Sequence, residues 1–267
     1  MIPLLAYLLT GAVAGFFAGL LGVGGGVIVV PVLGMLFVGL GFPADEVLHL
    51  ALGTSMAAIL FTSISSLRAH HAHGAVLWPA LRGLTPGVLA GMLLGAQLAA
   101  RISSRALAIF FVVFMLFVAV QMLANFRPPP SRRLPGRLGL AATGLGIGAV
   151  SSLAAIGGGA LTVPFLIWCN VRPHSAIGTS AAVGLPIAIG GSIGYVWNGW
   201  GHAGLPPGSL GFIYLPALGC ILAASVLTAP LGARLAHRLP VRTLKRVFAG
   251  LLVLLAGKML WSLFGAS

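Results

Sequence analysis

The chain carries one pattern of residues twice, as GVGGGVIVVP at positions 22–31 and as AIGGGALTVP at positions 155–164. A second pattern follows each copy, HLALGTS at 49–55 and HSAIGTS at 174–180. A glycine triplet alone means little in a chain with 39 glycines, but two patterns repeated in the same order are hard to obtain by chance. The sequence therefore predicts two related halves.

A basic, proline-rich segment marks the boundary between the halves. Residues 125–137 contain three consecutive prolines and four arginines. Proline breaks a helix and charge is expensive in lipid, so this segment is predicted to be a linker outside the membrane. We predict a first transmembrane repeat over residues 1–124, the linker over 125–137, and a second transmembrane repeat over 138–267.

The composition excludes a soluble protein. Of the 267 residues, 59% are hydrophobic and only 6% are charged, and the mean hydropathy is +1.10. A soluble chain carries about 25% charged residues. Because the sequence lacks the alternation of a β-barrel strand, we predict an all-α integral membrane protein surrounded by the lipid bilayer. The net charge of +13 fits basic loops at a membrane surface, and we expect no nucleic-acid partner.

Ten apolar blocks are long enough to form helices, and two of them are unusually short. The short blocks each follow a glycine triplet, which predicts helices broken by glycine inside the membrane. The blocks span residues 2–21, 27–40, 47–67, 78–99, 106–123, 138–156, 160–168, 175–197, 209–235 and 247–264.

The basic residues predict how the chain is oriented. With the linker in the cytoplasm, counting each block as a crossing also places Arg172 and the basic stretch 234–246 inside, and Asp45 and Glu46 outside. This requires an odd number of crossings in each half, so the halves are predicted to be inverted repeats of about four to five segments each. Transporters of this architecture bind substrate near the bilayer midplane, between the repeats.

The paired motifs resemble those of a known family. The first half contains Gly15-x3-Gly19-x2-Gly22-x-Gly-Gly-Gly26-x4-Pro31 and Gly53-Thr54-Ser55, and the second contains Gly157-Gly158-Gly159-x4-Pro164 and Gly178-Thr179-Ser180. Over nearly its whole length the chain resembles the TauE/SafE family of sulfite and organosulfonate exporters. The resemblance implies a multi-pass permease of the bacterial inner membrane that exports small sulfur-containing anions, such as sulfite or sulfoacetate.

The glycine triplets are the first candidates for substrate binding. At the start of a short helix, exposed N–H groups and the positive end of the helix dipole bind an anion without a charged side chain. The alternative is close helix packing, which the spacing Gly11-x3-Gly15-x3-Gly19 is expected to serve. The candidate residues are Gly24, Gly25, Gly26, Gly157, Gly158 and Gly159.

Hydroxyl groups and histidines near the triplets complete the predicted site. Thr54, Ser55, Thr179 and Ser180 could donate hydrogen bonds to sulfonate oxygens, or bond to their own helix instead. His49 and His174 could bind an anion, or could be histidines at the membrane interface. Four further histidines, His70, His71, His73 and His202, are expected to be solvated loop residues that hold no metal.

Several other functions are disfavoured. The chain lacks the HExxH, GxxxxGK[ST] and GxSxG motifs, so we predict that it is not an enzyme and needs no cofactor. Cation carriers place Asp or Glu inside the membrane, and here both acidic residues are adjacent in one loop. A carrier of another small anion and an intramembrane enzyme remain the alternatives, and a homo-oligomer stays open.

Overall fold

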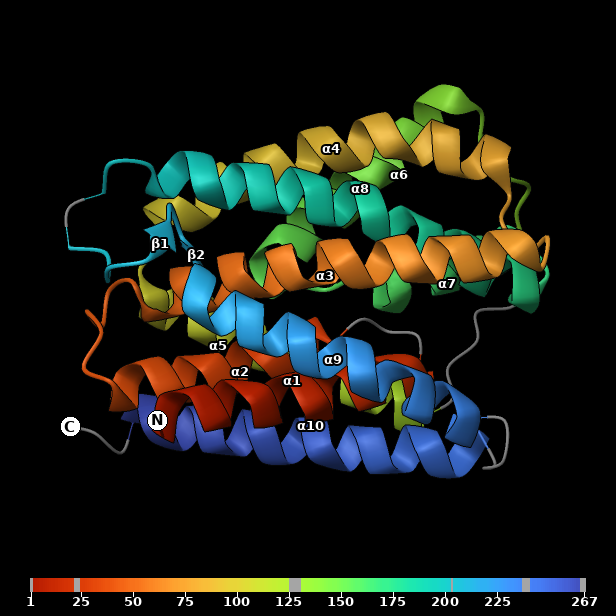
Figure 1. The fold of residues 1–267 in the computed structure, drawn as a ribbon. Helices are drawn as coiled ribbons and strands as arrows, with labels where there is room; N and C mark the ends of the chain where they lie inside the picture. Colours follow the sequence, from red (N-terminus) through yellow and green to blue (C-terminus); the bar gives the residue numbers. More distant parts are fainter. Residues whose placement is uncertain (1, 22–24, 125–130, 203, 237–240, 265–267) are drawn as a thin grey trace.

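The computed structural model describes residues 2–21, 25–124, 131–202, 204–236 and 241–264, so Gly24 lies outside the described residues. This part of the chain forms ten helices and one short β-hairpin (Figure 1). The first half contains α1 (Ile2–Leu21), α2 (Gly26–Gly39), α3 (Val47–Ala72), α4 (Trp78–Arg101) and α5 (Ser104–Leu123). The second half contains α6 (Arg137–Ala154), α7 (Gly159–Trp168), α8 (Pro173–Gly199), β1 (Ser209–Leu210), β2 (Ile213–Tyr214), α9 (Leu215–Ala236) and α10 (Val241–Phe264).

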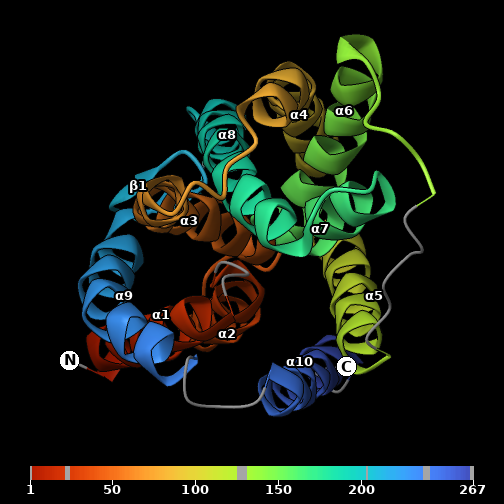
Figure 2. The same ribbon diagram turned by 90° about the vertical axis from the view of Figure 1, so that its right-hand side faces the viewer.

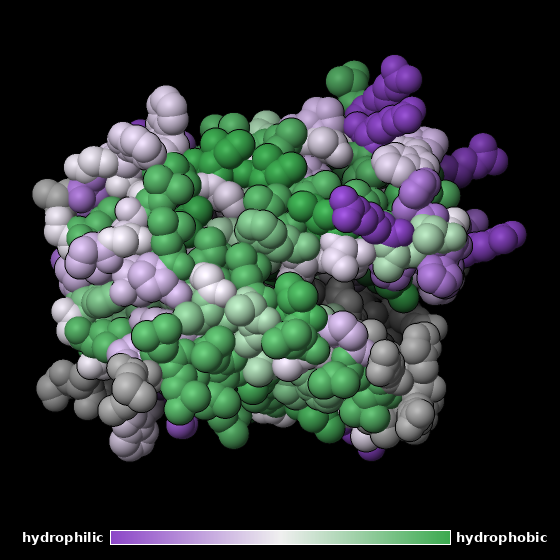
Figure 3. Space-filling model, viewed as in Figure 1, coloured by the Kyte–Doolittle hydropathy of each residue, from purple (hydrophilic) through white to green (hydrophobic). Residues whose placement is uncertain are grey.

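The predicted class of all-α integral membrane protein is confirmed. Among the described residues, six helices are long and apolar enough to cross a membrane, and three shorter apolar helices accompany them. Apolar side chains cover the flank of the molecule (Figure 3). Large apolar residues such as Leu227 and Val113 are more than half exposed, as expected for side chains that face lipid.

The two halves are interleaved and do not sit side by side as separate bundles. The most extensive helix contacts join α4 to α6, α1 to α9, α3 to α8, α4 to α8, and α5 to α10. Seen along the helices, α1, α2 and α9 lie on one side of α3 and α8, and α4 and α6 lie on the other (Figure 2). A Cβ on Gly11 of α1 would lie 2.5 Å from the carbonyl oxygen of Ile221 in α9, so this pair packs closely, as the glycine spacing predicted.

The loops divide between an acidic end and a basic end. At the acidic end (left in Figure 1), the Ser104 hydroxyl donates to the carbonyl of Asp45 at 2.6 Å, next to Glu46. At the basic end, the amides of Ser131 and Arg132 both donate to the carbonyl of Trp168. Figure 3 shows hydrophilic side chains gathered there. The basic end carries Arg68, Arg132, Arg133, Arg137 and Arg172, as the charge pattern predicted, whereas Arg101 and Arg105 lie at the other end, with Asp45 and Glu46.

Most of the expected helix bounds hold closely, but three blocks are corrected, one of them because α10 begins at Val241 and not at residue 247. The block 209–235 is not one helix, because residues 209–214 form a hairpin and α9 begins at Leu215. Gly208 and Gly211 have φ of 89° and 55°, which a helix does not allow. The third block does not stop at residue 67, because α3 continues to Ala72. His70 and His71 are therefore helical residues and not loop residues.

Candidate functional site

The two glycine breaks meet in the interior of the molecule. Gly26 begins α2, and a Cβ at Gly26 would overlap the carbonyl oxygen of Ala155, at the end of α6. Ala155 has φ 45° and ψ 46°, the left-handed conformation that ends many helices, and glycine usually occupies it. The break in the first half therefore touches the turn that precedes the glycine triplet of the second half.

Each break also lies beside the serine of its own Gly-Thr-Ser pattern. A Cβ on Gly26 would lie 3.0 Å from Oγ of Ser55. Gly158, with φ +40°, precedes α7, and a Cβ there would lie 3.0 Å from the carbonyl oxygen and 3.5 Å from Oγ of Ser180. The structure thus brings together the glycines and serines that the sequence singled out.

Hydroxyl groups without a protein partner are concentrated near these breaks. The Oγ atoms of Ser55 and Ser180 are buried, and no described residue forms a hydrogen bond with them. The same holds for Ser151 of α6 and Thr162 of α7. Leaving a buried polar group unpaired costs about 1–3 kcal/mol. Such groups beside two helix N-termini are what a polar ligand requires, because helix geometry also leaves the first N–H groups unpaired.

The two threonines of the patterns have a different role from the serines. The Thr54 hydroxyl accepts from the amide of Tyr214 at 2.9 Å, and the Thr179 hydroxyl accepts from the amide of Leu77 at 2.9 Å. Tyr214 and Leu77 each precede the fourth helix of the opposite half, α9 and α4. Each threonine therefore fixes, by a hydrogen bond, the residue that directly precedes a helix of the other half. A direct role in substrate binding stays a prediction.

The predicted histidines lie at opposite ends of the molecule. His49 is buried at the acidic end, where its ring nitrogens contact the carbonyl oxygens of Asp45 at 3.1 Å and Ala99 at 2.9 Å. His174 is exposed at the basic end, one residue into α8. The structure does not bring either histidine to the glycine breaks, so their place in a shared site stays a prediction.

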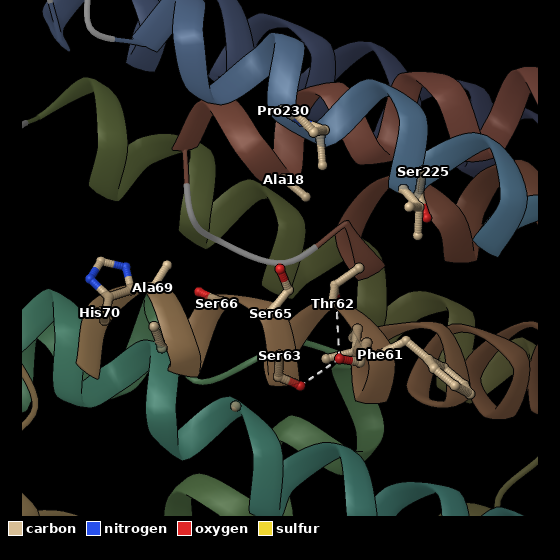
Figure 4. A pocket seen from close by; sticks show the side chains of 16 residues that line it. Ala18, Phe61, Thr62, Ser63, Ser65, Ser66, Ala69, His70, Ser225 and Pro230 are labelled. Atoms are coloured by element: carbon tan, nitrogen blue, oxygen red, sulfur yellow. Dashed lines mark hydrogen bonds between the residues drawn. The ribbon is translucent and has the colours of Figure 1, made fainter. Parts of the chain in front are cut away.

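A cavity of about 370 Å³ extends between α3, α8 and α9. Figure 4 shows Thr62, Ser65 and Ser66 of α3 facing Ala18 and Ser225, which come from α1 and α9. Gly157 of the second break also lines this cavity. A smaller pocket beside it shares four of its lining residues and adds Gly25, Gly26 and Ser55. The first glycine break is therefore contiguous with the cavity.

Sequence reasoning missed the hydroxyl-rich face of α3 and the histidine at its end. The sequence signal was present, because residues 62–66 hold four hydroxyl side chains in an otherwise apolar block. His70 was expected to be a solvated loop residue, and this is corrected: it is half-buried and lines the cavity. The predicted block ended at residue 67 because hydropathy falls at Arg68, although the helix itself continues to Ala72.

The comparison with family models decides the family. The model described as Sulfite exporter TauE/SafE matches residues 7–259. The chain belongs to the TauE/SafE family. The resemblance predicted from the paired glycine motifs is thereby confirmed over almost the full chain.

Individual relatives of this TauE/SafE protein agree in name. A probable membrane transporter protein of Haemophilus influenzae is 37% identical over 254 residues, which cover 95% of this chain and 96% of the relative. The probable membrane transporter protein YdhB of Bacillus subtilis is 27% identical over 269 residues, covering 95% and 100%. No solved structure matches significantly. This TauE/SafE chain is a multi-pass membrane transporter.

Proposed function

We propose that the protein exports small sulfur-containing anions, sulfite or an organosulfonate such as sulfoacetate, across a bacterial inner membrane. One observation carries the proposal: two helix N-termini, at Gly26 and Gly159, lie beside buried serine hydroxyls that have no partner among the described residues. N–H groups and hydroxyls that donate hydrogen bonds suit the oxygens of such an anion. The family description, which names sulfite, supports this substrate class.

The charge distribution favours an anion over a cation. Asp45 and Glu46 are the only acidic residues of the chain, and both lie in the loop before α3 at the acidic end. A cation or proton-coupled cation carrier needs a carboxylate within the membrane. The residues that line the cavity include one titratable side chain, His70. With no carboxylate in the cavity lining, the helix dipoles and the serine and threonine hydroxyls are the groups proposed to bind the substrate.

The helix contacts support two repeats related by an approximate two-fold axis, as the predicted inverted repeats would be. If each helix is matched to the helix at the same position in the other half, α1 corresponds to α6 and α4 corresponds to α9. The contact between α1 and α9 then corresponds to the contact between α6 and α4, and both are among the most extensive. In the same way, the hydrogen bond from the Tyr214 amide to Thr54 corresponds to the hydrogen bond from the Leu77 amide to Thr179. We place the basic end in the cytoplasm, by the positive-inside rule. The cavity, which includes the C-terminal part of α3, then reaches toward the cytoplasm, where an exporter loads.

Reconstituted liposomes test the proposed function. Vesicles are loaded in turn with sulfite, sulfate, sulfoacetate, taurine or thiosulfate, and a potential is set with K⁺ and valinomycin. We expect efflux of a sulfur oxyanion that speeds up as the compartment it leaves becomes more negative, since one charge moved through 100 mV changes the free energy by about 2.3 kcal/mol. Vesicles without protein are the control.

Two outcomes would count against parts of this proposal. Transport of none of these anions would refute the substrate class. Efflux that ignores the potential but follows a pH or Na⁺ gradient would refute a uniport mechanism and favour coupling through the histidines.

A further inference from the structure

One face of α3 leads along the cavity from the glycine break toward the basic end. Ser55, Ile59, Thr62, Ser66 and His70 follow one another at intervals of three or four residues, the spacing of one helix face. Ser55 and Ile59 line the smaller pocket, and Ile59, Thr62, Ser66 and His70 line the larger cavity. His70 stands about 22 Å from Ser55 along the helix axis, at 1.5 Å per residue.

His70 lies among basic groups, opposite a neutral wall. On its own element, Arg68 is two residues away and His73 interacts with it electrostatically. From α8, His174 also interacts with it electrostatically. Across the cavity, the described residues of α1 and α9 that line it are Ala18, Ser225, Val226, Ala229 and Pro230, none of which is charged. His70 is thus the one titratable group among the residues that line the cavity.

We propose that His70 and Ser66 form a second anion subsite at the basic end of the cavity, which a sulfur oxyanion occupies before it reaches the glycine breaks. This subsite rests on the proposed function, because it takes the same substrate. A protonated imidazole attracts an anion and donates a hydrogen bond to it, and the Ser66 hydroxyl one turn away donates a second. The surrounding Arg68, His73 and His174 raise the local anion concentration.

The subsite makes loading from the basic end depend on pH. An imidazole gains a proton, and with it a positive charge, as the pH falls. His70 carries its charge more often at pH 6, and the anion binds more tightly there. The described residues that line the pocket at the first glycine break include no titratable group, so the affinity of that break for a fixed anion does not follow this change.

The test compares KM for uptake at the basic end, with sulfite as the probe, for the wild type and the variants H70Q and H70R. Inside-out vesicles holding the full chain expose that end. Each comparison is made at one pH, so the ionisation of sulfite is the same for both proteins. H71Q is the matched control, because His71 occupies the same last turn but packs edge-on against Trp78 and does not line the cavity.

We expect H70Q to raise KM roughly three- to tenfold at pH 6 and to change it little at pH 8, with the maximal rate preserved. H70R keeps its charge and should hold KM low at both pH values, while H71Q should match the wild type. Equal KM values for H70Q and wild type at pH 6 would overturn the subsite and leave the proposed function standing. Absence of sulfite transport by the wild type would overturn both. If H70Q fails to fold, H70R is compared with the wild type at pH 8, and a KM of H70R that is no lower than that of the wild type overturns the subsite alone.

Discussion

At the scale of single residues, neighbouring hydroxyls in one motif have separate tasks. In each Gly-Thr-Ser pattern the threonine accepts a hydrogen bond from the other half, while the next residue, Ser55 or Ser180, is buried with no hydrogen-bond partner among the described residues. The repeated motif predicted that these residues matter. It did not separate the two roles, because the partner amides of Tyr214 and Leu77 lie 160 and 102 residues away in the sequence.

We predict that Ser55→Ala and Ser180→Ala each weaken sulfite binding without destabilising the fold. A lost hydrogen bond to a charged ligand costs about 1.5–3 kcal/mol, or roughly ten- to a hundredfold in Kd. The fold loses no described protein hydrogen bond, so the melting temperature should hold. Calorimetric titration and thermal unfolding measure the two effects.

Ser192→Ala is the matched control for these serines. Its hydroxyl is likewise buried and unpartnered, but it lies about 18 Å from Ser180 along α8 and lines neither pocket. Equal losses of affinity in all three variants would show that the effect is general and that Ser55 and Ser180 do not bind the anion.

At the scale of elements, hydropathy located the helices, and the glycine triplets located the breaks between them. The block expected at 27–40 is α2, Gly26–Gly39, and the block at 160–168 is α7, Gly159–Trp168. The hairpin at 209–214 was not predicted, because its sequence SLGFIY is as apolar as the start of a membrane helix. The positive φ of Gly208 and of Gly211 distinguishes the hairpin from a helix, and composition does not reveal these backbone angles.

Adding a single methyl group at the N-terminus of α2 should destabilise the folded protein. We predict that Gly26→Ala destabilises the protein by about 1–3 kcal/mol or more, since the new Cβ would overlap the backbone at Ala155. Gly34→Ala in the same helix is the control, because nothing lies within 4 Å of its Cβ position and alanine favours a helix. Thermal unfolding in detergent compares them, and equal melting temperatures would contradict the contact between the breaks.

The backbone just before α4 and α9 should open more often when the threonine hydroxyl that accepts its hydrogen bond is removed. We predict that Thr54→Val speeds hydrogen exchange at the Tyr214 amide and that Thr179→Val does so at the Leu77 amide, because valine keeps the shape but accepts no bond. Each change should cost about 1–3 kcal/mol. Thr143→Val, whose hydroxyl bonds only within its own helix to Gly139, should leave both amides unchanged.

At the scale of the whole molecule, the charge asymmetry predicts the orientation. We expect a cysteine at Ala72, at the basic end, to react with an impermeant maleimide only from the cytoplasmic side. A cysteine at Pro207, in the loop at the acidic end, should react only from outside. Cys169 and Cys220 are replaced by serine first, since they are the only native cysteines. Labelling of both positions from one side would refute this topology.

The interleaving of the halves has a consequence for how the protein is made. α1 ends at Leu21, yet α9, against which it packs so extensively, begins at Leu215, about 190 residues later. At about 5–20 residues per second, α1 waits in the bilayer for roughly 10–40 s before its partner is synthesised. During that interval Gly11 faces lipid where it will later meet Ile221. Defects in this face should therefore appear as poor yield during biosynthesis, before any transport is measured.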